Sequence, residues 1–447
     1  QIGPLQQAFG FGWGTALWGG STWGTARTTS DAVLDPGAWS LDNYGELLIA
    51  TIKNGSTFSW NPNTGVATRA TVISGAPTKS VMSLVSDRDR HLIILGTETT
   101  IGSSSSQDKM FIRFSDQETL TDYTATSTNT AGSFRIDSGT KIVGAAKAKD
   151  YVLILTDTSA YLMQFVGPPF TFSIRQVGSN CGCMGQKSIV YANGAVYWMS
   201  DSGGFFVFDG TVKALPCLVE DFVFQTNDNA PGFNVINGSE LTSAGHNGLY
   251  SEITWFYATS NSNFIDRSVT YNYAEQTWTT ASLARTTYED IHVFEDPIAT
   301  EFTNTLAPTT PTVQGVSNGA SRVFNHEVGT NEVLANGTTN AINAFIKSGD
   351  FDLDAQGDGE FFIKVRRFIP DFKYINGNAK ITLELRDYPA NVQQGSPLGP
   401  FTINSTTDKV DTRARARLAA VKIENDSTNE SWRFGQFRFD IQPDGRR

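Results

Sequence analysis

Residues 47–60 read LLIATIKNGSTFSW, and this stretch decides the fold. Residues 47–52 are apolar, Asn54-Gly55 follows, and residues 56–60 resume an extended pattern. Asn-Gly between two such runs is a strong β-hairpin signal, because both residues tolerate the positive φ of a tight hairpin turn. The stretch therefore predicts two antiparallel strands.

Four further pairs of short apolar strands follow along the chain. They are residues 91–95 with 110–114, 151–155 with 160–166, 196–199 with 205–208, and 253–257 with 268–273. Their spacing is close to the ~40–50 residues that a four-stranded propeller blade requires. Residues 59–69 and 271–281 also resemble two copies of one outer hairpin. The pattern predicts an all-β fold in which residues 39–295 form a β-propeller-like body of about six degenerate blades. A β-sandwich built from the same strands is the alternative.

Both ends of the chain differ from this body. Residues 1–38 are rich in Trp and Gly, and Trp13, Trp18 and Trp23 recur every five residues, which fits neither a helix nor a strand. We expect an extended arm that docks on a neighbour or on its own domain. Residues 296–343 are rich in Thr, Pro and Asn and predict a loop or insertion. Residues 344–447 predict a C-terminal β region that closes the propeller on its N-terminal strand, which would remove a sheet edge.

Arginine recurs at every second position near the C-terminus. Arg413, Arg415 and Arg417 would line one face of a strand predicted over residues 413–423, because strand side chains alternate between faces. Such a row could bind phosphates or acidic residues of a neighbouring subunit. It could equally be a solvated face paired with nearby carboxylates such as Asp411 and Glu424.

Charge is distributed unevenly along the chain. Residues 360–447 hold 15 Lys/Arg and 11 Asp/Glu, which gives +4, whereas residues 1–359 hold 19 and 34, which gives −15. An acidic body argues against ordinary duplex DNA binding but is compatible with a channel through which DNA slides. Three cysteines predict free thiols in a reducing compartment. We expect no signal peptide, because the opening residues lack its pattern, and we expect no membrane span, because no apolar run approaches the ~20 residues that one requires.

Two motifs resemble metal sites. Residues 352–360 resemble a calcium loop, but their spacing departs from the EF-hand pattern, so a polar turn is favoured. Cys181, Cys183 and Cys217 could bind a soft metal. The four histidines, His91, His246, His292 and His326, are scattered in sequence, so packed thiols are favoured. We predict no bound cofactor or metal.

The chain carries no catalytic motif of a known type. Five aspartates lie near predicted strand ends, namely Asp42, Asp87, Asp157, Asp201 and Asp209, but the sequence does not pair them as a glycosidase would require. GxSxG, HExxH and GxxxxGK[ST] are absent. We therefore expect no enzymatic activity.

Four motifs in order resemble the tail nozzle proteins of short-tailed, podovirus-type phages, also called tail tubular protein B or packaged-DNA stabilisation proteins. They are GWGTALWGGSTWGTAR (residues 12–27), WSLDNYGELLIATIKNGSTFSW (39–60), RRFIPDF (366–372), and RARARLAAVKIEN with WRFGQFRFDIQPDGRR (413–425 and 432–447). Together they reach both ends of the chain.

The resemblance implies a non-catalytic β-propeller subunit of a hexameric ring below the portal adaptor, or head-to-tail connector. It implies a distal DNA channel that retains the packaged genome, tail fibres or spikes on the outside, and a place in the virion tail after assembly in the host bacterial cytoplasm. Trp13, Trp18, Trp23, Arg413, Arg415 and Arg417 are then expected to contact subunits or the adaptor. Two other readings stay open: a propeller-fold protein, phage-borne or secreted, that binds or cleaves glycans, and a bacterial surface scaffold or adhesin.

Overall fold

The described part of the chain divides into two units, one within residues 1–327 and the other within residues 328–447. The computed structural model describes residues 38–225, 232–233, 239–262, 264–302, 321–334, 337–352, 361–388 and 397–445. We call the two parts the propeller unit and the sandwich unit. Trp13, Trp18 and Trp23 lie outside the described residues, so their role in an N-terminal arm stays a prediction.

The predicted first hairpin is confirmed. Strand β2 (Leu47–Ile52) pairs antiparallel with β3 (Thr57–Trp60), and Thr51 lies opposite Thr57. Asn54 adopts a φ of 57°, which an asparagine tolerates better than most residues. The turn residues thus set the register of these strands.

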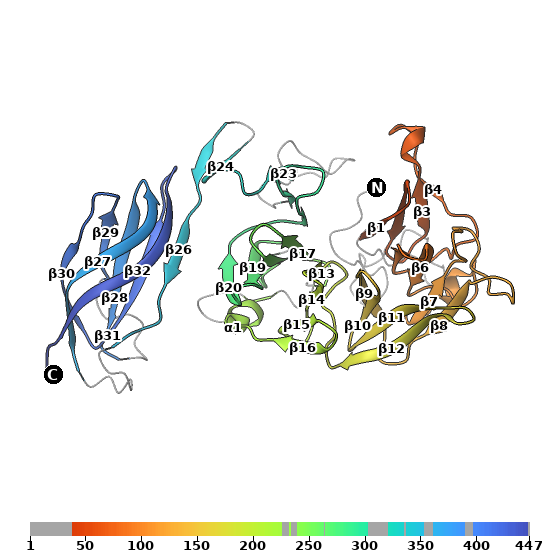
Figure 1. Cartoon of the computed structure of the whole chain (residues 1–447), viewed down its shortest axis with the longest axis horizontal. Coiled ribbons are helices and arrows are strands. Elements are labelled where there is room, and N and C mark those ends of the chain that lie inside the picture. The colour runs from red at the N-terminus through yellow and green to blue at the C-terminus, as the bar shows by residue number, and fades with distance from the viewer. Residues whose placement is uncertain are drawn as a thin grey trace, which may run out of the picture. The chain divides into compact units, whose positions relative to one another are not determined.

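The propeller unit consists of successive small antiparallel sheets (Figure 1). Sheet one holds β1 (Trp39–Tyr44), β2, β3 and β4 (Thr71–Val72). Sheet two holds β5 (Met82–Ser86), β6 (His91–Leu95), β7 (Phe111–Phe114) and β8 (Gly132–Arg135). Sheet three holds β9 (Ile142–Lys147), β10 (Val152–Thr156), β11 (Ser159–Gly167) and β12 (Thr171–Ser179). Sheet four holds β13 (Ile189–Ala192), β14 (Ala195–Met199), β15 (Phe205–Phe208) and β16 (Val212–Leu215). Sheet five holds β17 (Thr242–Asn247), β18 (Glu252–Tyr257), β19 (Arg267–Asn272) and β20 (Thr277–Ala281).

A sixth, three-stranded sheet follows, with β21 (Thr287–Glu289), β22 (Ile298–Phe302) and β23 (Ser321–Asn325). The sequence placed residues 296–343 in a loop or insertion, and this is wrong at both of its ends. The Thr- and Pro-rich composition is most pronounced between β22 and β23, whereas IATEF and SRVFN have the extended pattern of strands.

The six sheets are arranged as the blades of a propeller. The first strands follow one another in space, with β1 beside β5, β5 beside β9, β9 beside β13, β13 beside β17, and β17 beside β21. Strands β6, β10 and β14 are buried along their whole length because neighbouring sheets cover both of their faces. The outer strands β4 and β20 are mostly exposed. This inner-to-outer gradient confirms the propeller-like body.

Helical structure is sparse in the described chain. It comprises α1 (Glu220–Phe224) and two short 3₁₀ segments, η2 (Pro62–Thr64) and η3 (Ser104–Ser106). No described helix is long and apolar enough to cross a membrane.

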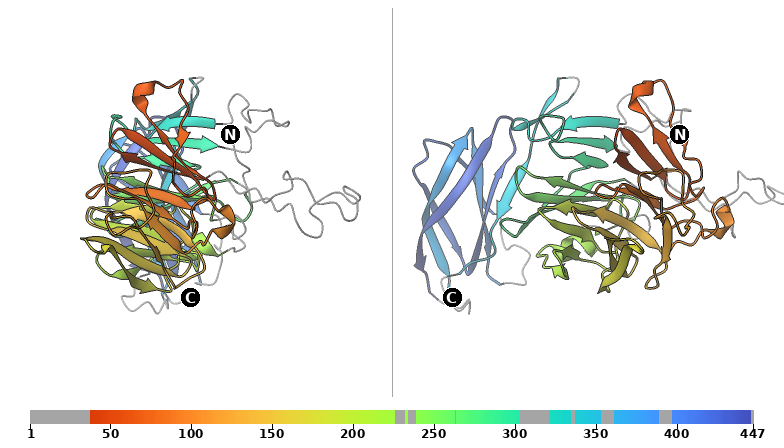
Figure 2. Two further views of the ribbon diagram at one scale, coloured as in Figure 1. Left: turned by 90° about the vertical axis from the view of Figure 1, so that its right-hand side faces the viewer. Right: turned by 45° about the vertical axis from the view of Figure 1, so that its right-hand side comes forward.

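The sandwich unit pairs two sheets face to face (Figure 2). One sheet has the order β26 (Ala344–Lys347), β31 (Leu418–Asn425), β28 (Ala379–Arg386) and β29 (Leu398–Ile403). The other has the order β30 (Val410–Ala416), β27 (Ile363–Asn376) and β32 (Ser431–Pro443). A hairpin of β24 (Asn331–Val333) and β25 (Thr339–Ala341) completes the unit.

The prediction that residues 344–447 close the propeller by pairing with its N-terminal strand is wrong. These strands pair with one another, and β1 pairs with β2 among the described strands. The reason is that both sheets have an apolar inner face. Phe368 from one sheet and Ile381 from the other are fully buried in one core. The C-terminal strands thus bury their apolar surface without the propeller.

Candidate functional site

The predicted arginine row begins as expected on the outer face of β30. Arg413 and Arg415 are exposed, and Ala414 and Ala416 between them are buried. The Nε of Arg415 lies 2.6 Å from Oδ2 of Asp444, and its guanidinium lies 4.1 Å from the centre of the Phe362 ring. Arg415 is therefore partly neutralised within its own chain.

Arg417 departs from the prediction. The expected strand 413–423 is two strands, because β30 ends at Ala416 and β31 begins at Leu418 in the other sheet. Arg417 is the corner residue between them, half-buried over the rings of Phe362 and Tyr388. Its role is therefore packing at the sandwich edge rather than extending the exposed row.

The fold places further cations in the same sheet as Arg413. The sequence alone did not predict that these residues lie together. Strand β27 lies between β30 and β32, and five exposed cations of this sheet have no carboxylate within 4 Å among the described residues. They are Lys364, Arg366, Lys373, Arg413 and Arg433. We call them the basic face. Alternation within 363–376 and 431–443 signals an outward face for each strand, but their pairing is not visible in the sequence.

Some charges of the same sheet are neutralised locally. Arg367 lies 3.4 Å from Asp440 and 3.8 Å from Asp411, and Arg438 lies 3.9 Å from Asp371. The three strands together hold eight Lys/Arg and three Asp/Glu, so the sheet carries +5. The expectation that these cations pair with carboxylates of their own chain thus holds for part of this sheet. It does not hold for the five residues of the basic face.

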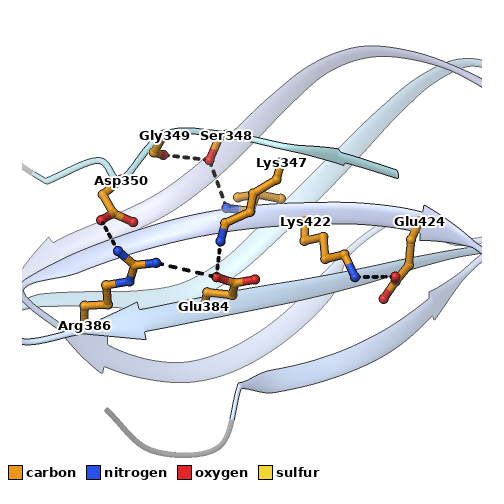
Figure 3. Close-up of polar contacts among 9 residues, drawn as sticks. Lys347, Ser348, Gly349, Asp350, Glu384, Arg386, Lys422 and Glu424 are labelled. Atoms are coloured by element: carbon orange, nitrogen blue, oxygen red, sulfur yellow. Dashed lines mark hydrogen bonds and ion pairs between the residues drawn. The ribbon is translucent and has the colours of Figure 1, made fainter. Parts of the chain in front are cut away.

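The opposite sheet of the sandwich contrasts with the basic face, because its outward charges are paired (Figure 3). Lys347 Nζ lies 2.5 Å from Glu384, and Arg386 bridges Glu384 at 4.0 Å and Asp350 at 3.1 Å. Lys422 pairs with Glu424 at 2.5 Å on the same side. Exposed pairs of this kind contribute little stability, but they leave little net charge to attract a partner. The sandwich therefore has one neutralised face and one basic face.

Partly exposed ion pairs link different sheets of the propeller unit. Lys147 of sheet three donates to Asp42 of sheet one at 2.9 Å and to Asp87 beside sheet two at 3.0 Å. The two aspartates raise the pKa of Lys147 above its usual value, although burial acts in the opposite direction. Lys53 after β2 pairs with Glu240 before β17, which ties sheet one to sheet five. These ion pairs therefore join sheets that do not follow one another along the chain.

Two of the five candidate aspartates lie close together. Asp157 follows β10 and Asp201 follows β14, and a Cβ built on Gly182 would meet both of them, at 2.1 Å from O of Asp157 and 2.7 Å from Oδ1 of Asp201. Burial and the neighbouring Asp157 raise the pKa of Asp201. Burial acts to raise the pKa of Asp157 too, but hydrogen bonds from Thr140 and Lys141 outweigh it, so that pKa is lowered. The remaining three aspartates pair with lysines, since Asp42 and Asp87 bind Lys147 and Asp209 binds Lys213.

The cysteines behave as packed thiols. Cys181 and Cys183 are buried in one cluster of the core, while Cys217 packs in another. Burial raises the pKa of Cys183 to about 12 and that of Cys181 to about 11. Within the described ranges, no group of three or more His, Cys, Asp or Glu residues could hold a metal ion. Residues 353–360 of the predicted polar turn lie outside those ranges.

Comparison with known proteins adds little beyond the fold. No protein-family model matches the sequence, and no curated protein matches it. BamB from Moraxella catarrhalis is similar at 15% identity and a TM-score of 0.32, over 60% of this chain and 83% of that one. Saccharomyces cerevisiae Sqt1 is similar at 8% identity and a TM-score of 0.36, over 60% and 80%. A chain of the mitotic checkpoint complex has 10% identity and a TM-score of 0.38, over 59% and 70%. Scores this low carry no argument about function.

Proposed function

We propose that this chain is a structural subunit of a phage tail nozzle, in which copies form a ring, hexameric by resemblance, around the distal DNA channel. The ring retains the packaged genome and lets it leave at infection. It sits against the portal adaptor and carries tail fibres or spikes outside. The subunit acts by shape and charge, without catalysis or cofactor, in the virion tail after assembly in the host cytoplasm.

One observation carries the proposal. Motifs that are far apart in the sequence, RRFIPDF, the RARA of residues 413–416 and WRFGQFRFDIQP, lie on β27, β30 and β32 and so share one sheet. That sheet bears the basic face. Three members of the basic face, Arg366, Arg413 and Arg433, therefore belong to motifs that carry the family resemblance. Arg413 is the member of the predicted contact set that best suits a subunit or adaptor contact.

The propeller unit supports a channel formed between copies rather than through one copy. The pairs Lys147–Asp42 and Lys53–Glu240 join sheets of the propeller unit that do not follow one another along the chain, which favours a DNA path outside the single copy. Residues 1–327 hold 18 Lys/Arg and 29 Asp/Glu and so carry −11. Acidic walls repel phosphates and let DNA slide without binding.

Electron microscopy and mass photometry of the full chain test the proposal. We expect a six-fold ring with a central opening, and weak duplex DNA binding even at low salt. A protein that stays monomeric at every concentration would refute the ring. Tight, salt-sensitive binding of duplex DNA would refute an acidic lumen.

The Asp157–Asp201 pair favours a second candidate function, the cleavage or binding of glycans. The acid and the base of a glycosidase are carboxyl groups whose environments shift their pKa values apart, and the pKa of Asp201 is raised while that of Asp157 is lowered. Release of reducing sugar from bacterial polysaccharide, abolished by Asp201→Asn, would establish this function in place of the nozzle. A polysaccharide that stays intact in the presence of the protein would rule out glycan cleavage.

A further inference from the structure

One end of sheets five and six exposes apolar side chains on two neighbouring turns. Leu249 and Tyr250, between β17 and β18, are 61% and 50% exposed. Val293 and Phe294, between β21 and β22, are 92% and 58% exposed. The turns are adjacent, since the backbone N–H of Gly248 donates to Oδ2 of Asp290 at 2.9 Å. Clustered exposed apolar side chains of this kind mark interaction surfaces.

Carboxylates surround these turns. Burial and the charges of Glu327 and Glu275 raise the pKa of Glu252. Glu289 and Glu295 are also exposed on β21 and the following turn. The nearby histidines supply little charge, because burial lowers the pKa of both His246 and His326. We call these turns and carboxylates the acidic face.

A buried acceptor lies in the same place. The Nδ2 of Asn247 donates to Glu327 at 3.0 Å, and the Oδ1 atom of Asn247 has no hydrogen-bond partner among the described residues. Asn247 is 6% exposed. The acidic face thus combines carboxylates that repel one another with an acceptor that lacks a hydrogen bond. A cationic donor such as Lys or Arg would reduce the repulsion and could satisfy the acceptor.

The basic face of the sandwich unit, like the acidic face, has exposed apolar side chains next to charged ones. Its charge is of the opposite sign. Ile369 and Tyr374 of β27 are 41% and 56% exposed in the same strand as Lys364, Arg366 and Lys373. Protein interfaces usually combine exposed apolar side chains with charged ones, as this strand does.

We propose that the basic face of one copy binds the acidic face of a second copy. The contact joins two different surfaces, so it is heterologous and repeats from copy to copy until a ring closes. It rests on the ring proposed above and assigns the surfaces that build it. Nucleic acid fits the basic face less well, because a phosphate backbone offers no counterpart for the exposed Ile369 and Tyr374.

Zero-length carbodiimide cross-linking of mixed light and heavy isotope-labelled full-length protein tests the contact. The reagent joins an amine to a carboxylate that already touches it. We expect light–heavy links from Lys364 or Lys373 to Glu275, Glu289 or Glu295. Links found only within one isotope would mean that the faces meet inside a single chain, which would overturn the proposal.

Charge reversal supplies the second arm. Lys364→Glu with Arg413→Glu, and separately Glu275→Lys with Glu289→Lys, should each weaken self-association at least about tenfold in mass photometry. Combining all four changes restores opposite signs and should recover association. Reversing two exposed cations elsewhere, Arg175→Glu with Lys149→Glu, is the matched control and should change little.

The outcomes separate the contact from the ring. A chain that never self-associates refutes both. A ring that forms normally in both reversed pairs refutes this contact and leaves the ring standing. Salt-dependent capture of duplex DNA that the basic-face reversal abolishes, with no light–heavy links, would assign the face to nucleic acid instead.

Discussion

Replacing Phe368 with alanine tests whether the sandwich unit folds independently of the propeller. Phe368 is fully buried between the two sheets, with its ring 5.7 Å from that of Phe401 and 5.5 Å from that of Phe437. A buried aromatic side chain removes about 150–250 Å² from water. At about 25 cal/mol per Å², the loss is about 4–6 kcal/mol, close to the ~3–5 kcal/mol typical of such truncations.

The expected effect is confined to one transition. The roughly 120 residues of the sandwich unit have an unfolding entropy near ~0.25 kcal/mol per kelvin, so its melting temperature should fall by about 12–20 °C. The propeller transition should not move. Differential scanning calorimetry measures both, and fluorescence of Trp432, the one tryptophan of this unit, reports the sandwich.

Ile253→Ala is the matched control, since Ile253 is fully buried in the propeller core. It should cost that unit about 2–5 kcal/mol and leave the Trp432 signal in place. A single cooperative transition that both variants shift equally would refute two independent units. It would show that the two units unfold as one cooperative block.

Three other perturbations have defined outcomes. Gly182→Ala should destabilise the propeller unit by at least about 1–3 kcal/mol in urea, because its Cβ would lie 2.1 Å from O of Asp157. Burial and Arg285 lower the pKa of His326 to about 4, below its unfolded value, so the unfolded state binds more protons between pH ~6.5 and 4. The free energy of unfolding should therefore fall as pH falls through that window, and less so in His326→Gln. The native thiol of Cys183, whose pKa burial raises to about 12, should resist alkylation at pH ~8 and react on unfolding.

Each of these three has a contrary result. Gly349→Ala, where nothing lies within 4 Å of the added Cβ, should be neutral, and equal effects of the two glycine variants would contradict the steric argument. An identical pH slope in wild type and His326→Gln would show that this histidine does not titrate on unfolding. Rapid alkylation of Cys183 in the native protein would show that its cluster opens.

The propeller strands could be predicted because their signals are local. Asn54-Gly55 gave the first hairpin, and residues 151–155 with 160–166 gave the pair β10 and β11. Residues 298–302 and 321–325 were missed, because the Thr- and Pro-rich segment between them obscured two short strands. The corner at Arg417 was missed too, since alternation continues in sequence across the single residue at which the chain changes sheets.

The basic face and the acidic face were beyond prediction for a different reason. Each is made by elements that are distant in sequence, such as β27 with β30 and β32, or the turns after β17 and β21. His246, His292 and His326 were described as scattered in sequence. The fold brings His246 of β17 to Asp290, after β21, at 3.3 Å, and His326, after β23, to Arg285, before β21, at 2.8 Å. Proximity of this kind depends on sheet pairing rather than on spacing.

The sequence alone determined that this protein is built from short antiparallel strands, with an acidic body and a basic C-terminal region. Turn chemistry and alternation act over a few residues, and net charge depends only on composition. Only the tertiary structure decided that the last strands form a sandwich of their own, and that its two outer faces differ in charge. Those facts depend on which strands pair, and long-range burial selects that pairing. The arginines near the C-terminus thus become part of a basic surface only because they pair with β27, a strand some 40 residues earlier. That pairing places Lys364 opposite Arg415.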